Sequence, residues 1–194
     1  MAIPLYDALS VRLSRMAGDT VSSATTDGNK ATSALRDIIL NNAIRVFIDR
    51  KIKERDEEAL RGYLTKSAST AMVGNILDVS AFSPKVHDLW SCYNDTGNVP
   101  IYPIPQGYTF GQLKNITIST GYLPNYFQFQ SNKIYVTGAG ATDSVTVVYV
   151  GQHTDLTANT GSTDIAIDSP YWNELLQIAL ELWKIEILGK GDAQ

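Results

Sequence analysis

The sequence of 194 residues predicts an α+β fold, in which a small helical bundle carries an antiparallel β insert. The bundle consists of an N-terminal helix, a long central helix and a C-terminal helix. Apolar residues recur at helical spacing only near the two ends of the chain, in residues 1–67 and 168–189. Residues 70–167 are instead rich in β-branched and aromatic residues and are interrupted by Gly, Pro and Asn. We therefore expect a single domain of residues 1–194.

The N-terminal helix is predicted from Pro4, which suits the first turn of a helix, to a stop at Gly18. Between them, apolar residues recur every three or four positions. A polar stretch rich in Ser and Thr follows over residues 19–30, and it predicts a loop. Thr32 or Ser33 then caps the central helix.

The central helix is predicted over residues 32–66, because this stretch contains no proline and its only glycine is Gly62. Its first half has one apolar face. From Arg50 onward the apolar positions become rare and charges of both signs alternate, which predicts a helix that leaves its own core. We interpret this half as a subunit interface, with a solvated helix face as the alternative. The candidate interface residues are Arg50, Lys53, Arg55, Glu57, Glu58 and Arg61.

The β insert contains several short apolar runs that predict strands. Those runs are residues 76–79, 99–104, 116–119, 126–130, 133–137 and 144–150. Pro100 and Pro103 lack N–H donors, so they confine their strand to a sheet edge. Ser131 and Asn132 predict a tight hairpin turn, and residues 138–143 predict the loop of a second hairpin. The sequence of residues 83–92 does not show whether this segment forms a helical turn or another structure.

The C-terminal helix is predicted from Ser169 as the N-cap and Pro170 in the first turn, after a brief strand over residues 165–167. It ends by Gly189, and its apolar stripe is expected to pack on the central helix. The members of this stripe are Trp172, Leu175, Leu176, Ala179, Leu182 and Trp183.

Composition excludes several classes of protein. The net charge is −4, and the basic residues are interspersed with acids, so direct binding to nucleic acid is not expected. One cysteine, Cys92, excludes an intrachain disulfide. No apolar run has the length of a membrane span, so we expect no membrane segment.

Catalytic motifs are weak in this chain, and we expect neither an enzyme nor a cofactor or metal site. The chain has only two imidazoles, His87 and His153, and it lacks the G-x-S-x-G and phosphate-loop motifs. A small thiol hydrolase remains a rival hypothesis if His153 meets Cys92. A carbohydrate-binding β module is a second rival, and it requires that the aromatic residues of the insert be exposed on one face.

Four segments carry a resemblance to a known family. The segment LRDIILNNAIRVFIDR contains a leucine-asparagine-alanine core at Leu40, Asn41, Asn42 and Ala43. PNYFQFQSNKIYV and VTVVYV follow in the β region, and DIAIDSPYWNELLQIAL covers the terminal helix. In this order, the segments resemble the head-to-tail adaptor (connector) proteins of tailed bacteriophages.

The resemblance implies a structural protein of the virion neck, made in the host cytoplasm. Such proteins form a homo-oligomeric ring, commonly a dodecamer, beneath the portal protein. The ring continues the DNA channel, through which genomic DNA passes without sequence-specific binding. It also gives a tail or nozzle protein a surface to bind. No membrane takes part in this assembly.

Overall fold

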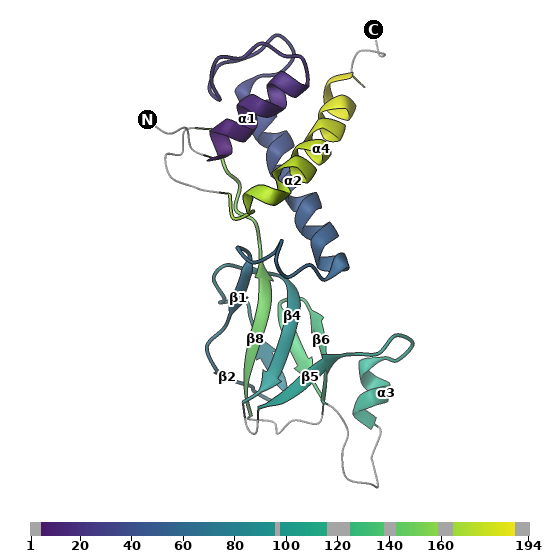
Figure 1. The fold of residues 1–194 in the computed structure, drawn as a ribbon. Helices are drawn as coiled ribbons and strands as arrows, with labels where there is room; N and C mark the ends of the chain where they lie inside the picture. The colour runs from purple at the N-terminus through teal and green to yellow at the C-terminus, as the bar shows by residue number, and fades with distance from the viewer. Residues whose placement is uncertain (1–4, 96–97, 116–124, 138–142, 159–164, 189–194) are drawn as a thin grey trace. The chain divides into compact units, whose positions relative to one another are not determined.

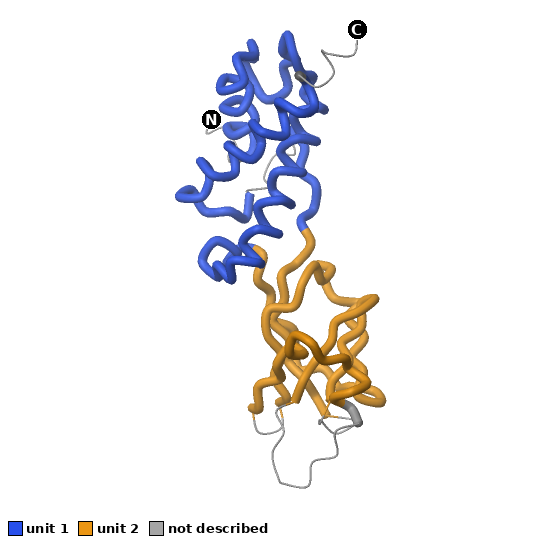
Figure 2. Tube along the Cα trace, turned by 90° about the vertical axis from the view of Figure 1, so that its right-hand side faces the viewer, with its two compact units in different colours: residues 1–62, 153–194 blue, residues 63–152 orange. Residues whose placement is uncertain are grey.

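The computed structural model describes residues 5–95, 98–115, 125–137, 143–158 and 165–188. The chain divides into two compact units, which Figure 2 colours separately. The helical unit contains residues 1–62 and 153–194, and the strand unit contains residues 63–152. The helical unit is thus built from both ends of the chain, with the strand unit inserted between them.

The helical unit contains three α-helices, α1 (Leu5–Met16), α2 (Ser33–Glu54) and α4 (Trp172–Trp183), among its described residues. A 3-10 turn, η1 (Ser169–Tyr171), precedes α4, and a π-helical turn, η2 (Lys184–Leu188), follows it. Figure 1 shows α1 and α4 beside α2. Their apolar faces form one core, which includes Leu9, Leu13, Ile39, Leu40, Ala43, Ile44, Phe47, Leu175, Leu176 and Ala179.

The loop between α1 and α2 is irregular, as predicted, and two buried charged side chains hold its backbone. The carboxylate of Asp19 accepts hydrogen bonds from the backbone N–H groups of Thr20, Asn29, Lys30 and Ala31. The guanidinium of Arg36 donates to the carbonyl oxygens of residues 24 and 26, both at 2.7 Å. These bonds satisfy backbone groups that have no partner in a helix or a sheet.

The strand unit is a mixed sheet of eight strands in the described residues. Its strands are β1 (Leu64–Lys66), β2 (Thr70–Ala71), β3 (Ile76–Asp78), β4 (Val86–Asn94), β5 (Val99–Pro103), β6 (Asn125–Gln130), β7 (Lys133–Val136) and β8 (Ser144–Gly151). The order is β1-β8-β4-β5-β6-β7-β3, with β2 also paired to β8. A short helix, α3 (Phe110–Asn115), lies between β5 and β6 in the chain.

The sheet curls around its own hydrophobic core. Register shifts in β4, near residues 86–88 and 89–91, bend this strand where it pairs with β8. Thirteen buried residues form the core, and β3, β4, β5, β6, β7 and β8 all contribute to it. The two ends of the strand unit lie side by side, because Gly151 N–H donates to the carbonyl oxygen of Tyr63 at 2.9 Å.

The predicted architecture, a helical bundle with an antiparallel β insert, is therefore wrong. The chain is α+β, but the curled sheet is a half-barrel that forms a strand-rich core of its own, not an appendage to the helices. The sheet is also mixed, because β5 and β6 run parallel. Strand order and direction are set by contacts between residues far apart in the chain, which local periodicity does not report.

Several local predictions are confirmed. Strands occur at five of the predicted runs, as β3, β5, β6, β7 and β8. Ser131 and Asn132 form the turn between β6 and β7 with φ values of 52° and 59°, the left-handed pair that a two-residue hairpin turn requires. The predicted run 116–119 lies outside the described residues.

Other local predictions are wrong. Strand β5 is not at an edge, because residues 99–101 pair with β4 and residues 101–103 pair with β6. Each of these ladders has only three residue pairs and therefore needs few N–H donors, which accommodates two prolines. β7 and β8 do not form a hairpin, since they pair with different strands. Residues 165–167 form no strand. The segment 83–92, for which no structure was predicted, contains most of β4.

The terminal helix gives the first test. Trp183 is 2% exposed, so Trp183→Ala should lower the free energy of unfolding by roughly 3 to 5 kcal/mol, because it leaves a cavity in the interior of the helical unit. Ile185, which is 68% exposed, provides the control, and Ile185→Ala should change stability by less than about 0.5 kcal/mol. Chemical denaturation measures both. Equal stabilities of the two variants would show that Trp183 is not a core residue.

Candidate subunit interface

The six predicted interface residues are all exposed, but they do not share one helix. Helix α2 ends at Glu54, and Arg55 adopts a left-handed conformation with φ 57°. Its N–H donates to the carbonyl oxygen of Ile52, which closes the last helical turn. Of the six, Arg50 and Lys53 therefore lie on α2. The other four are Arg55, directly after the helix, and three residues in the turns that follow. The predicted helix to residue 66 is wrong.

The turns of residues 56–62 are fixed to the helical unit by burial. Ala59 is 2% exposed and Leu60 is fully buried. The carboxylate of Asp56 accepts a hydrogen bond from the N–H of Ala59 at 3.0 Å. Gly62 lies so close to the backbone of Ala166 that an added Cβ would meet its carbonyl oxygen at 2.2 Å. The sequence-based expectation that this half has too little apolar surface for its own core is therefore wrong.

A buried lysine beneath this segment joins α2 to α4. Lys51 is 7% exposed, and its ammonium group lies 2.8 Å from Glu54 and 3.0 Å from Glu174. The carboxylate of Asp56, just beyond the end of α2, lies 3.7 Å from the same ammonium group. The hydrogen bond that Lys51 donates to Glu54 contributes most to its raised pKa, and the hydrogen bond to Glu174 adds to it, so the ammonium stays charged.

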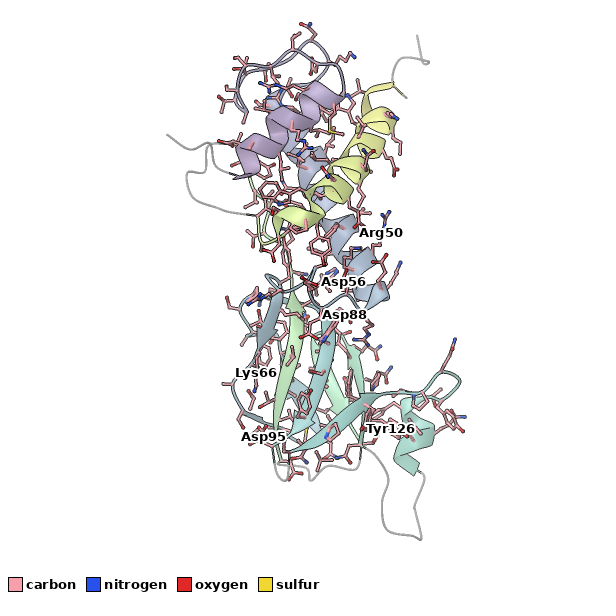
Figure 3. All side chains as sticks on the ribbon, viewed as in Figure 1. Arg50, Asp56, Lys66, Asp88, Asp95 and Tyr126 are labelled. Carbon is pink, nitrogen blue, oxygen red and sulfur yellow. The ribbon has the colours of Figure 1, made fainter. Side chains whose placement is uncertain are left out.

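The same ammonium lies over two aromatic rings. It is 5.6 Å from the ring centroid of Phe47 and 5.7 Å from that of Tyr171. Arg50 adds a second ion pair to Glu174, at 3.4 Å. Figure 3 shows Arg50 and Asp56 at this end of α2. A lysine is rarely buried without charged partners, so this cluster fixes the backbone that presents the six charged residues.

A buried amide holds the returning chain against α2. Asn41 is 4% exposed, and its side-chain NH2 group donates to the carbonyl oxygens of Asp37 at 2.8 Å and Leu156 at 2.7 Å. Its side-chain oxygen lies 2.9 Å from the N–H of Leu156 and 2.9 Å from Nε2 of His153. Since an amide oxygen only accepts, the Nε2 of His153 carries the proton.

The residues of the thiol hydrolase hypothesis lie in different units. Cys92 is 1% exposed in the strand unit, and burial raises the pKa of its thiol to about 12, so the nucleophilic thiolate is not favoured at neutral pH. His153 belongs to the helical unit and contacts Asn41.

In the described parts of the chain, no cluster of three His, Cys, Asp or Glu residues is suited to hold a metal ion. No helix among the described residues is long and apolar enough to cross a membrane.

The aromatic residues of the insert are divided between two environments. Phe127 and Tyr149 are buried in the core of the strand unit. Tyr102 is 49% exposed and Tyr108 is 55% exposed. The aromatic residue Tyr122 lies outside the described residues. The condition for carbohydrate binding, exposure on one face, is thus met by only part of the aromatic set.

Comparison of the chain with protein-family models and with curated proteins gives no match.

The Asn41 network gives the second test. Asn41→Ala removes the partners of the N–H and the carbonyl oxygen of Leu156, which should cost roughly 3 kcal/mol of unfolding free energy. Asn42→Ala is the matched control, because the exposed neighbour Asn42 only accepts a hydrogen bond from Arg45. Its cost should stay below about 0.5 kcal/mol. Equal costs in urea denaturation would contradict this role of Asn41.

The pH dependence of stability gives the third test. Burial lowers the pKa of His153 from 6.5 to about 4. As pH falls from 6.5 to 4, the unfolded chain binds a proton at this residue and the folded chain does not, so the free energy of unfolding falls. In His153→Gln, which keeps an N–H donor, the melting temperature should fall less over this range than in the wild type. Parallel melting curves would contradict a neutral, buried His153.

Proposed function

We propose that the protein is the subunit of a structural ring that joins the capsid portal of a tailed bacteriophage to its tail and continues the DNA channel. In this proposal, the ring is a dodecamer, as is common in the family that the chain resembles. The partners are other copies of the chain, the portal protein and a tail or nozzle protein, and the location is the neck of the virion.

The observation that carries the proposal is a set of exposed charged side chains of both signs at residues 50–61, on a backbone that buried residues hold in place. Four cationic and two anionic side chains, all exposed, stand on a segment anchored by Lys51 and Leu60. In a closed ring, each subunit meets the next through two different surfaces, so a fixed charge pattern suits a heterologous contact. Charges arranged in this way set register and partner choice more than they add affinity.

A second support is the role of Asn41, which belongs to the leucine-asparagine-alanine core of the resemblance. In the helical unit this residue joins α2 to the segment that enters α4, through contacts with residues 153 and 156. A motif with this packing role fits an adaptor whose two chain ends form one body. The resemblance and this packing agree on the same residue.

Charge reversal in the candidate interface tests the proposal. Four substitutions, Arg55→Glu, Glu57→Lys, Glu58→Lys and Arg61→Glu, leave the net charge unchanged. They should abolish ring formation on the purified portal, as seen by electron microscopy, because the charge pattern would oppose its partner surface. Circular dichroism and melting temperature should stay at wild-type values, since these side chains are exposed.

The matched control reverses four exposed charges elsewhere in the helical unit. These substitutions are Arg15→Glu, Glu181→Lys, Lys184→Glu and Glu186→Lys, which also leave the net charge unchanged. This control should still form rings. If the first variant also assembles with the portal, residues 55–61 are a solvated surface and the interface assignment is wrong. If the wild-type protein does not assemble with the portal, the adaptor proposal itself fails.

A further inference from the structure

The sheet of the strand unit has a second face, opposite its core, that carries tyrosines in register. Cys92, Ile101 and Phe127 point into the core. Since side chains alternate along a strand, their neighbours point the other way. Tyr102 on β5 lies directly beside Tyr126 on β6, which Figure 3 labels.

The row of outward side chains continues across the next pair of strands. Gln128 follows Tyr126 on the same face of β6 and lies opposite Tyr135 on β7. Phe110, at the start of α3, packs edge-on against Tyr135 with ring centroids 5.8 Å apart. This contact places the start of α3, and the loop before it, over the outward face of β6 and β7. Figure 1 shows α3 beside β6.

A cleft opens between this loop and the sheet. Its volume is about 530 Å³, within the range of small-ligand sites. Its lining includes Ile104, Pro105, Gln106, Tyr108, Phe110 and Gln128. The strand β6 contributes Gln128, and the rest comes from residues 104–111, so the cleft is built within the strand unit alone.

The lining has a specific chemical character, because none of the residues around the cleft is charged. A charged ligand would lose its hydration there without gaining an opposite charge. The amides of Gln106 and Gln128 both donate and accept hydrogen bonds, and the ring of Tyr108 is 55% exposed. A matching ligand is neutral and has one flat apolar face and a rim of hydroxyl groups.

We propose that this cleft binds a neutral saccharide. The apolar face of a pyranose ring stacks on Tyr108, and its hydroxyl groups bond to Gln106 and Gln128. This site is separate from the candidate subunit interface, which lies in the helical unit. The binding of a saccharide and the assembly of a ring are therefore independent properties, and each can fail without the other.

Affinity electrophoresis of the full chain tests the proposal. Native gels contain dextran, mannan, xylan or galactan as neutral probes, and alginate as an anionic probe. At least one neutral polysaccharide should retard the wild-type protein, and alginate should not. Tyr108→Ala and Gln128→Ala should each raise the Kd, taken from the dependence of mobility on probe concentration, by about tenfold or more. Melting temperatures check that both variants are folded.

Tyr93→Ala is the matched control. Tyr93 is a partly exposed tyrosine of the same sheet, on β4, and it does not line the cleft. This variant should bind as the wild type does. The proposal is overturned if no neutral polysaccharide retards the protein, if alginate alone does, or if Tyr108→Ala binds normally. It is also overturned if Tyr93→Ala loses binding equally. Binding of a synthetic proline-rich peptide in the cleft, without any saccharide binding, would instead assign the cleft to a protein partner.

Discussion

The side chain of Asn41 holds the helical unit together across the break in its sequence. Its amide bonds to backbone groups of Asp37 on its own helix and of Leu156, which lies 115 residues further along the chain. With His153 as a further partner, every polar atom of this buried side chain is engaged. An apolar residue of similar size would pack in this place, but it would leave two backbone groups of the returning chain unpaired. The position of α4 on α2 therefore depends on one polar side chain as well as on apolar packing.

The sequence predicted the features that depend on residues close in the chain. Helix α1, the start of α2 at the Thr32 cap and the 131–132 turn are determined by capping, spacing and turn chemistry within a few residues. The sheet order was not predictable in this way. In the sequence of β4, polar and apolar residues do not alternate regularly, because its bulges interrupt the alternation that is typical of a strand. Nothing local indicates that β5 pairs in parallel with β6.

The sequence predicted the exposure of the six charged residues of the candidate interface, but not the shape of the backbone that carries them. The charge pattern of residues 50–61 indicated exposure, and all six side chains are exposed. The pattern did not reveal that Arg55 stops the helix, because a left-handed arginine has no composition signal of the kind that glycine gives. The pattern also did not reveal that Lys51, in the same charged stretch, is buried with Glu174 from the other end of the chain. The cleft near Tyr108 was also missed, since it arises from a loop folded over strands that the sequence did not place together.

The hydrogen bond between Tyr63 and Gly151 has an evolutionary consequence. The chain enters and leaves the strand unit at neighbouring points, as β1 and β8 pair from Leu64 and Val150 onward. A segment whose two ends are adjacent is replaceable by another of different length without separating the halves that flank it. Genetic exchange at these two positions would leave α1, α2 and α4 intact. The adjacent ends therefore make the strand unit a module that recombination can exchange without any change in the sequence of the helical unit.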